Sequence, residues 1–385
     1  MLCKSEECCG CGACYNVCPQ NCIEMTKDSE GFSYPIINNE TCINCGMCEK
    51  VCPIINTVDI SSVTEVYAAK NKSSLLREHS SSGAVFPSLA RWILDHHGYV
   101  CGAVYDDTFT VVHRISDKKE DIQKMCGAKY SQSDSWECFK NIKTFLSLGK
   151  LVLFVGTPCQ TLGLKKYLGK EYQNLVTVDM ICHGVPSPKV WKKYVQERNI
   201  VDAPEVELID IQLRNKDSGW SKYNYSVKFE YENKMEYKVN QQEDKFIKGF
   251  TSNLFLRPSC SHCIFKGIER ASDITLGDFW GIWNINPEFD DDRGVSLIMV
   301  HSEKGRLMWN NIKRDFESFS VDIHKAVEQN PSALIPSKEH DKREYFFQNI
   351  DASDNVIKLI TECLYQPYKE ISIVERLKHM ILNWR

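Results

Sequence analysis

The pattern of apolar and polar residues predicts both helices and strands along most of the chain. Apolar runs at residues 151–155 and 175–181, with a helical stretch at 160–168 between them, predict a strand, a helix and a strand that pair in parallel. Alternation over residues 205–240 predicts antiparallel strands whose aromatic residues pack within the sheet, and residues 295–300 predict another apolar strand. We therefore expect an α+β or α/β fold built on a mixed sheet.

The apolar spacing of residues 86–93 predicts a well-defined helix. Pro87 falls in its first turn, Gly98 lies beyond its end, and Ser80-Ser81-Ser82-Gly83 precede it. A serine-rich start suits a phosphate group, because it presents free backbone N–H groups, hydroxyls and the positive end of the helix dipole. The alternative is that Ser80, Ser81 or Ser82 simply caps the helix. No G-x-G-x-x-G fingerprint occurs, so a standard Rossmann NAD site is not supported.

Breaks in this pattern divide the chain into domains. Residues 1–56 form a cysteine-rich N-terminal domain, in which residues 22–26 and 32–36 flank a hairpin turn at 28–31. Residues 57–65 are small and polar and are predicted to be a linker to a central domain of residues 66–300. Residues 301–385 are predicted to be mostly helical, with a mildly basic segment at 371–385 and no recognisable chemistry.

Composition and charge exclude several classes of protein. The 385 residues are 43% hydrophobic and 25% charged, which excludes a largely disordered or collagen-like chain. No run approaches the roughly 18 apolar residues of a membrane span, and the first residues lack the order of a secretory signal, so a cytoplasmic protein is expected. The formal net charge of −4 falls entirely within residues 1–56. This distribution of charge does not favour binding to nucleic acid, and it favours a partner with a basic surface.

The cysteine content is unusual, because 11 of the 19 cysteines lie before residue 53. In a reducing compartment such cysteines are expected to stay free or to bind metal rather than form disulfides. Two blocks repeat the spacing C-x2-C-x2-C-x3-C-P, namely Cys8, Cys11, Cys14 and Cys18, and then Cys42, Cys45, Cys48 and Cys52. Two zinc knuckles are the alternative, but zinc sites usually combine two cysteine pairs across a longer loop, so these compact quartets favour iron–sulfur clusters.

Both blocks resemble those of bacterial two-cluster ferredoxins. The resemblance implies one 4Fe-4S cluster on Cys8, Cys11, Cys14 and Cys52, and a second on Cys42, Cys45, Cys48 and Cys18. Gly12 and Gly46 would keep the backbone close to the clusters. Cys3, Cys9 and Cys22 fall outside the register and are interpreted as thiols that bind no iron.

Four further cysteines could form another metal site. Cys159 and Cys182 follow the two predicted parallel strands, where ligands bind in α/β sheets, and Cys260 and Cys263 form a C-x2-C pair. Together they could hold a third 4Fe-4S cluster or a zinc ion, although Cys159 and Cys182 could equally be small buried hydrophobic residues. His183 and His262 are interpreted as hydrogen-bonding neighbours. The cysteines without spacing partners are expected to serve packing: Cys101, Cys126, Cys138 and Cys363.

Six further blocks of sequence follow one another along the chain: Ser81-Ser82-Gly83, Gly127-Ala128-Lys129-Tyr130-Ser131, Gly156-Thr157-Pro158-Cys159-Gln160, Cys182-His183-Gly184-Val185-Pro186, Cys260-Ser261-His262-Cys263 and Ser272-Asp273-Ile274-Thr275-Leu276-Gly277-Asp278. In this order they resemble the coenzyme F420 hydrogenase/dehydrogenase beta subunit family with a ferredoxin-type N-terminal extension. The resemblance covers about residue 4 to about residue 300, and the last 85 or so residues are outside it.

This resemblance implies a ferredoxin-like domain, a central flavin-binding domain that holds FAD, and a third cluster on Cys159, Cys182, Cys260 and Cys263. The implied flavin contacts are Ser81, Ser82, Gly83, Lys129, Tyr130 and Ser131, with Thr157 and Asp278 near the ring. Lys129 and Asp278 are the candidate catalytic residues, and the alternative for Lys129 is a solvated side chain.

The implied activity is that of an iron–sulfur flavoprotein oxidoreductase. Electrons would pass from a reduced carrier such as ferredoxin through the clusters to FAD and then to an organic acceptor, or in the reverse direction, as with coenzyme F420. One alternative is an electron-transfer subunit without a substrate of its own, bound to other subunits of a redox complex. A second alternative is a zinc-stabilised binding protein.

Overall fold

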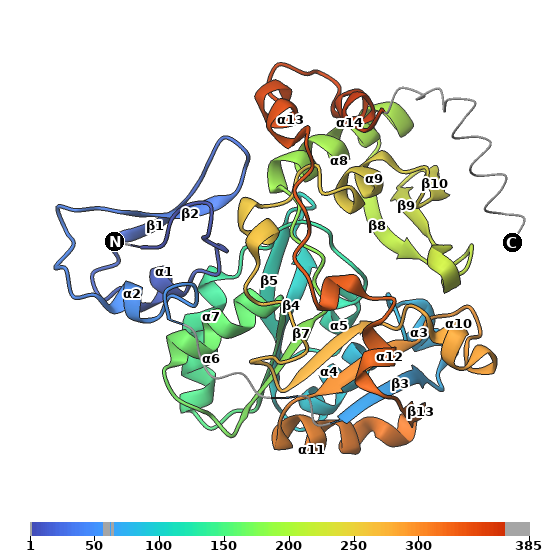
Figure 1. The fold of residues 1–385 in the computed structure, drawn as a ribbon, viewed down its shortest axis with the longest axis horizontal. Helices are drawn as coiled ribbons and strands as arrows, with labels where there is room; N and C mark the ends of the chain where they lie inside the picture. The colour runs from blue at the N-terminus through green and yellow to red at the C-terminus, as the bar shows by residue number, and fades with distance from the viewer. Residues whose placement is uncertain (1, 57–61, 63–64, 366–385) are drawn as a thin grey trace, which may run out of the picture.

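A computed structural model describes residues 2–56, 62 and 65–365 of the chain. Most of the predicted linker and the basic segment at 371–385 lie outside the described residues. The N-terminal domain projects from one side of the molecule, next to α6 and α7, and a small sheet with its helices lies over one edge of a large central sheet (Figure 1). None of the described helices combines the length and the apolar character needed to cross a membrane.

The N-terminal domain contains the predicted hairpin. Strands β1 (Ile23–Lys27) and β2 (Ser33–Ile37) pair antiparallel, and the Asp28 carboxylate accepts hydrogen bonds from the backbone of Glu30 and Phe32 across the turn. The short helices α1 (Ala13–Val17) and α2 (Met47–Lys50) start within the two cysteine blocks. Gly12 and Gly46 precede them with φ angles of 77° and 71°, a left-handed conformation that favours glycine.

The central sheet is mixed, with four adjacent parallel strands and antiparallel strands on both sides. The parallel pairs are β4 with β6, β6 with β7, and β7 with β11, so the predicted parallel pair at residues 151–181 is confirmed. Their carboxyl ends share one edge of the sheet. In spatial order the strands are β13 (Phe316–Ser320), β3 (Glu65–Asn71), β12 (Ser296–Val300), β11 (Ile274–Asp278), β7 (Leu175–Met180), β6 (Val152–Gly156), β4 (Tyr99–Tyr105) and β5 (Val111–Ser116).

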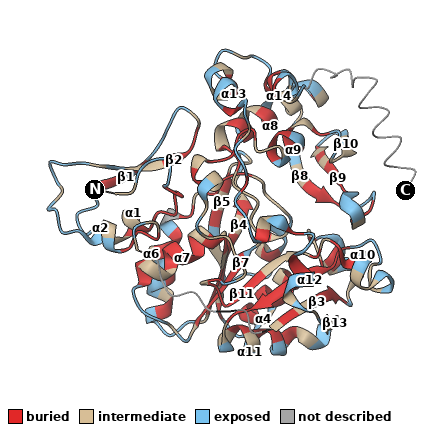
Figure 2. Cartoon of the chain, in the orientation of Figure 1, coloured by how far each residue is buried: buried red, intermediate tan, exposed pale blue. Residues whose placement is uncertain are grey.

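Helices cover both faces of this sheet, so its central strands are buried (Figure 2). The helices α4 (Val85–Asp95), α5 (Asp121–Met125) and α11 (Glu303–Ile312) pack on one face, where Leu89 and Ile93 of α4 contact a core that includes Leu153 and Val178. The helices α6 (Trp136–Ser147) and α7 (Pro158–Leu168) pack on the other face, and α10 (Ile282–Ile285) and α12 (Ile323–Val327) lie over β3 and β12. The short α3 (Ser74–Glu78) follows β3.

The predicted helix near residues 86–93 is confirmed as α4, but capping by a serine is wrong. Ala84 is the N-cap residue, with a φ of 67°, and no side chain caps the helix. The Ser80 hydroxyl donates instead to the Leu76 carbonyl oxygen, and the Ser82 hydroxyl donates to that of Val295. These serines tie the loop to α3 and to the sheet, so the helix begins later than its serine-rich start suggests.

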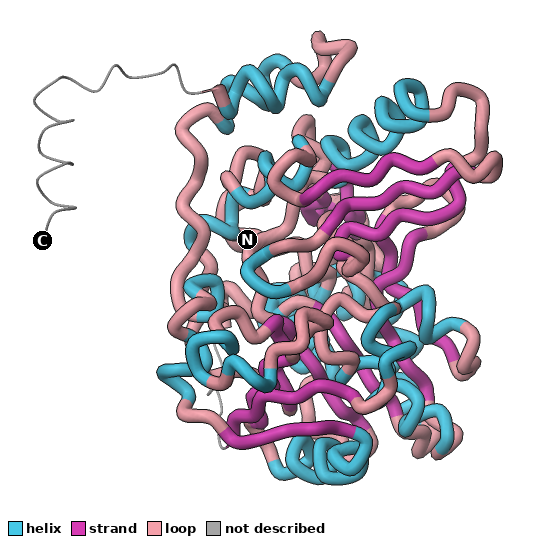
Figure 3. Tube along the Cα trace, turned by 90° about the vertical axis from the view of Figure 1, so that its right-hand side faces the viewer, coloured by secondary structure: helices cyan, strands magenta, loops and turns pink. Residues whose placement is uncertain are grey.

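The predicted antiparallel strands at residues 205–240 form a separate small sheet (Figure 3). It consists of β8 (Leu208–Asn215), β9 (Ser226–Tyr231) and β10 (Glu236–Asn240), and it is covered by α8 (Pro188–Asp202), α9 (Lys245–Thr251), α13 (Arg343–Asn349) and α14 (Val356–Leu364). Phe229 packs at right angles to Tyr194, with 5.9 Å between ring centres. The expected role of the aromatic residues in sheet packing is therefore confirmed.

The C-terminal region is largely helical as expected, but it also contains a strand that the sequence analysis does not predict. Residues Phe316–Ser320 form β13, which pairs antiparallel with β3 at the outer edge of the central sheet. A five-residue edge strand buries little apolar surface, so its alternation is too weak to predict from the sequence.

Candidate functional site

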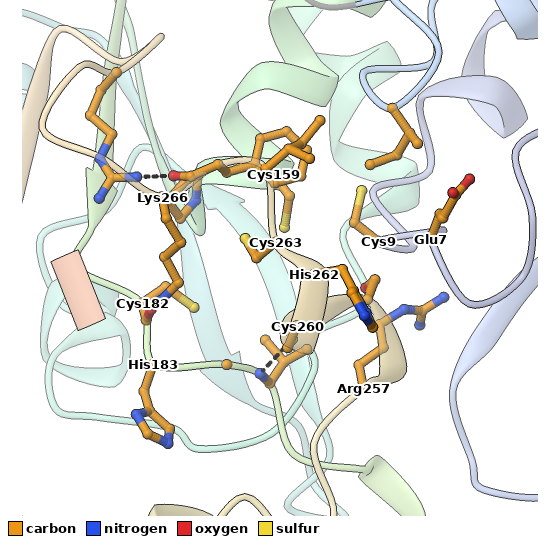
Figure 4. A pocket seen from close by; sticks show the side chains of 18 residues that line it. Glu7, Cys9, Cys159, Cys182, His183, Arg257, Cys260, His262, Cys263 and Lys266 are labelled. Atoms are coloured by element: carbon orange, nitrogen blue, oxygen red, sulfur yellow. Dashed lines mark hydrogen bonds between the residues drawn. The ribbon is translucent and has the colours of Figure 1, made fainter. Parts of the chain in front are cut away.

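Cys159, Cys182, Cys260 and Cys263 lie around one cavity of about 390 Å³ (Figure 4). Cys159 is in the first turn of α7, directly after β6, and Cys182 follows β7. Because β6 and β7 are parallel neighbours, their carboxyl ends bring these two thiols to the same edge of the sheet. Cys260 lies in a 3-10 helix, Pro258–His262, and Cys263 follows it. We call these four residues the cysteine tetrad.

The surroundings of the tetrad do not favour four bare thiolates. Burial raises the pKa of Cys260 to about 12 and also raises the pKa of Cys182 and Cys263, where neighbouring thiols add to the effect. A hydrogen bond with Cys9, together with burial, raises the pKa of Cys159. Four thiolates in this place need the positive charge of bound metal. Neither the tetrad nor any other group of three or more His, Cys, Asp or Glu side chains among the described residues is placed to hold a single metal ion. The cavity between the tetrad thiols has room for a group larger than a single ion.

The two N-terminal cysteine blocks line two further hollows. Cys18 lies with Cys42, Cys45 and Cys48 around a hollow of about 240 Å³. Cys52 lies with Cys8, Cys11 and Cys14 around a smaller hollow of about 20 Å³, which Cys3 also lines. The fourth cysteine of each block has thus crossed to the other block, which is the grouping that the ferredoxin resemblance implies. We call the smaller hollow site one and the larger one site two.

The three thiols expected to bind no iron all lie beside candidate ligands. The Cys22 Sγ is 3.3 Å from that of Cys18, and the Cys3 Sγ is 3.9 Å from that of Cys52. A hydrogen bond from Cys3 lowers the pKa of both Cys8 and Cys52 to about 6, and the charge of Arg257 acts in the same direction on Cys8. Cys9 hydrogen-bonds with Cys11 and Cys159.

Site one and the tetrad are adjacent, although they belong to different domains. Cys9 lines both the hollow of site one and the cavity of the tetrad. A Cβ atom on Gly163 of α7 would lie 2.9 Å from the Cys11 Sγ, so only glycine allows this approach. The same helix carries Cys159 in its first turn. One helix therefore carries a cysteine of the tetrad and contacts a cysteine of site one.

The predicted flavin residues lie near the same sheet edge, but none of them lines the tetrad cavity. Gly83 has a packing role, because a Cβ atom there would lie 2.3 Å from the Ala69 carbonyl oxygen. The carbonyl oxygens of Ser81 and Ser82 accept hydrogen bonds from Trp220 and Lys216. The Thr157 hydroxyl lies 3.1 Å from the Cys159 Sγ, so this predicted flavin residue contacts the tetrad.

Tyr130 and Asp278 meet at a buried arginine that the sequence analysis misses. The Arg214 Nη1 donates to Asp278 Oδ2 at 2.7 Å and to the Tyr130 hydroxyl at 3.3 Å. The Arg214 Nε and Nη2 atoms, the Ser131 hydroxyl and the Tyr105 hydroxyl are buried and have no hydrogen-bond partner among the described residues. Unpaired buried donors are costly, so this group is suited to a ligand that accepts hydrogen bonds. Arg214 lies near the end of a strand that also contains Asp210 and Gln212, so no sequence signal distinguishes it.

Lys129 is not freely solvated. Its Nζ donates to the Cys126 carbonyl oxygen at 2.7 Å and lies 5.6 Å from the centre of the Tyr105 ring. Burial lowers its pKa to about 8. His183 donates or accepts hydrogen bonds with Ser332 and Asn253, and His262 does so with Ser261, as expected for neighbours rather than ligands. Cys101, Cys138 and Cys363 are buried in the hydrophobic cores, and Cys126 is half-buried.

Two four-cysteine sites in a small N-terminal domain, followed by an α/β domain, define an iron–sulfur protein. Residues 7–55 match the family described as the 4Fe-4S dicluster domain, and residues 149–321 match the C terminus of the coenzyme F420 hydrogenase/dehydrogenase beta subunit. The N-terminal region is therefore a 4Fe-4S dicluster domain, and residues 149–321 belong to the coenzyme F420 hydrogenase/dehydrogenase beta subunit family. The family predicted from the six sequence blocks is confirmed.

Comparison with solved structures identifies a chain of the xenon-derivatised F420-reducing NiFe hydrogenase complex from Methanosarcina barkeri. The identity is 16%, the match covers 76% of this chain and 94% of that chain, and the TM-score is 0.46. Comparison with curated proteins gives no match.

Proposed function

We propose that this protein is an iron–sulfur flavoprotein that transfers electrons between a carrier protein and an organic substrate. The path runs from the carrier through site two and site one to a third 4Fe-4S cluster on the cysteine tetrad, and then to FAD. The observation that carries this proposal is the convergence of the tetrad on a cavity that Cys9 of the N-terminal domain also lines. In this proposal the site-one cluster and the tetrad cluster would therefore lie next to each other at the boundary between the two domains.

The donor set supports a third iron–sulfur cluster. The four thiols of the tetrad lie around the cavity, whose lining also includes Cys9 and Glu7 of the N-terminal domain, and thiolates are the usual ligands of 4Fe-4S clusters. The Val185 backbone N–H lies 3.4 Å from the Cys260 Sγ, and the Thr157 hydroxyl lies 3.1 Å from that of Cys159. Such hydrogen bonds to ligand sulfur raise the reduction potential of a cluster.

The buried donors around Arg214 support FAD. Arg214 and Ser131 would donate hydrogen bonds to acceptor atoms of the flavin or its phosphates, and Asp278 would hold the guanidinium in place at 2.7 Å. Lys129 would supply a positive charge whose proton is lost near pH 8. Bound FAD would supply the change between one-electron and two-electron transfer.

Site two is the place where we propose that the carrier docks. Cys45 is exposed, and Ile43 and Met47 beside it have exposed fractions of 60% and 41%. The exposed Glu40 lies two residues before Cys42. Together with the negative charge of residues 1–56, this surface suits a carrier such as a ferredoxin that presents a complementary, basic face.

An alternative is that the chain is an electron-transfer subunit that passes electrons to another subunit. This alternative is favoured by the description of the matching family, which is that of a beta subunit. The two possibilities share the same clusters and FAD. They differ in whether an organic substrate or a second protein receives the electrons.

Iron, sulfide and flavin analysis of protein purified without oxygen tests the proposal. Three clusters give about twelve irons per chain, whereas the dicluster domain alone gives about eight. We expect about twelve irons, one FAD and no zinc, and we expect Cys260→Ser to lower the iron content to about eight while the N-terminal clusters remain. The matched control is Cys363→Ser, which removes a buried thiol that lines none of the three hollows, and it should retain about twelve. About eight irons in the unaltered protein, or zinc in the tetrad, would overturn the third cluster, and the absence of FAD would overturn the flavin.

A further inference from the structure

Arg257 lies at the boundary between the N-terminal domain and the rest of the molecule, and it is 1% exposed. Its Nε donates to the Cys8 carbonyl oxygen at 2.7 Å, and its Nη2 donates to that of Ser33 at 3.0 Å. Its Nη1 donates to the Gln132 side-chain oxygen at 2.8 Å. Two of the three guanidinium nitrogens therefore bind the N-terminal domain directly, and the third binds Gln132, whose own side chain donates to the Cys9 carbonyl oxygen.

The same side chain is enclosed by aromatic rings. The guanidinium carbon lies 4.2 Å from the centre of the Tyr34 ring and 5.4 Å from that of Phe32. Gly10, with a φ of 67°, permits this close packing, because a Cβ atom there would lie 2.9 Å from the Arg257 Nη1. The fit between the arginine and the cysteine loop is therefore tight.

The charge of Arg257 has no carboxylate partner among the described residues. Its three hydrogen bonds to oxygen go to neutral groups, and it forms no ion pair with a carboxylate of the described residues. Buried charges are usually paired, because removing an ion from water is costly. The guanidinium lies against the cysteine loop of site one, where the Cys8 carbonyl oxygen accepts a hydrogen bond from its Nε, so negative charge bound at that site would pair with it.

Arg257 is also bonded to both metal sites through its backbone and side chain. Its side chain holds the Cys8 carbonyl oxygen, and its own carbonyl oxygen accepts the backbone N–H of Cys260 at 2.9 Å. Cys8 belongs to site one and Cys260 to the tetrad. Figure 4 shows Arg257 on the side of the cavity where Cys9 and Glu7 of the N-terminal domain lie.

We propose that Arg257 is a positioning residue for electron transfer between the cluster of site one and the tetrad. Its hydrogen bonds fix the separation of the two sites, on which the rate of electron transfer depends steeply. Its charge stabilises the reduced form of a cluster, because reduction adds a negative charge close to the guanidinium. The part of this inference that concerns the tetrad rests on the proposed third cluster, whereas the part that concerns site one requires only the dicluster domain.

The test measures the midpoint potentials of the clusters by a redox titration followed by electron paramagnetic resonance. Arg257→Gln removes the charge and should make the reduction equilibrium of the site-one cluster at least tenfold less favourable, a shift of about 59 mV to more negative potential for one electron. Arg257→Lys keeps the charge and should recover most of this shift, but it cannot make all three hydrogen bonds. Both variants should slow electron transfer between the site-one cluster and the tetrad.

Arg343→Gln is the matched control. Arg343 is also buried at the boundary with the N-terminal domain, but it pairs with the Glu30 carboxylate at the hairpin turn, at 3.0 Å from its Nη1. Its loss should lower thermal stability without shifting a potential. Equal shifts in Arg257→Gln and Arg343→Gln, or no shift in Arg257→Gln with its iron retained, would overturn the proposal.

Two further measurements keep the test decisive. If Arg257→Gln does not retain iron, Gly10→Ala displaces the guanidinium while leaving its charge, and it should slow transfer between the two sites with a smaller change in potential. An unchanged transfer rate in Gly10→Ala would contradict the positioning role. If the unaltered protein contains about eight irons, the third cluster fails, but the potential of the site-one cluster still tests the charge of Arg257.

Discussion

Lys129 illustrates how burial changes the chemistry of a single residue. Its pKa is lowered to about 8 from the ordinary value of 10.5, chiefly because burial disfavours the charged form, while Cys126 and Asp210 act in the opposite direction. The ammonium charge is therefore complete below about pH 8 and is lost as the pH rises through that value. Because the folded pKa is the lower one, this charge destabilises the folded state most below pH 8, and the penalty declines toward pH 10.5.

We expect the pH dependence of flavin reduction to report this titration. A loss of about 1.4 kcal/mol of charge interaction corresponds to a roughly tenfold slower reduction between pH 7 and pH 9. Lys129→Met should abolish the inflection near pH 8 and should be slow throughout. The control Lys124→Met removes an exposed lysine of α5 that pairs with Asp121, and it should keep the inflection. Stopped-flow measurement of flavin reduction across this pH range tests the prediction. If the inflection persists in Lys129→Met, another group causes it.

Single residues also show how much of the candidate site can be predicted from the sequence. The spacing of the N-terminal cysteines predicts their grouping, because the repeated spacing gives each cysteine a defined position in the motif. Arg214 and Arg257 have no such motif, and their importance comes from partners far away in the sequence, such as Asp278 and Cys8. The roles of Ser82 and Gly83 depend on the neighbouring strand β12, which the local sequence does not show.

Among the helices and strands, α7 is the one that contacts both the tetrad and site one. Its first turn carries Cys159, and Gly163 one turn later faces Cys11 of site one. The sequence predicts this helix and the two strands around it, because apolar runs and a helical stretch mark each of them. Contact between α7 and the N-terminal domain is tertiary, so no periodicity predicts it, and the same is true of the pairing of β13 with β3.

Gly163→Val should separate the N-terminal domain from α7. The Cβ atom alone would lie 2.8 Å from the Cys11 Cβ, and overpacking of this kind typically destabilises a protein by about 1–3 kcal/mol. We expect a lower unfolding temperature and slower electron transfer between site one and the tetrad. Gly102→Ala is the matched control, because its added Cβ would meet only the flexible Met125 side chain, at 3.2 Å. Calorimetry compares the two variants, and equal stability would mean that the contact with Cys11 adjusts without strain.

For the whole molecule, the separation of charge along the sequence becomes a separation in space. Residues 1–56 hold the net negative charge, and they form the domain that projects from the main body (Figure 1). The sequence predicts the charge difference but not that Cys45 of site two is exposed while Cys8 and Cys11 of site one are buried. The electron path that we propose would therefore run from an exposed acidic surface to a buried boundary.

A carrier that docks at site two should therefore respond to charge at this surface. We expect electron transfer with a basic carrier to slow as ionic strength rises, because salt screens exposed charges over about 10 Å at 0.1 M. Glu40→Lys places a positive charge two residues from Cys42 and should slow the reaction several-fold at low salt, with the difference disappearing at high salt. Glu232→Lys makes the same change in net charge in an exposed turn of the small sheet and should have little effect. Rates measured against salt concentration distinguish the two variants, and equal slowing would show that total charge, rather than the surface at site two, governs the encounter.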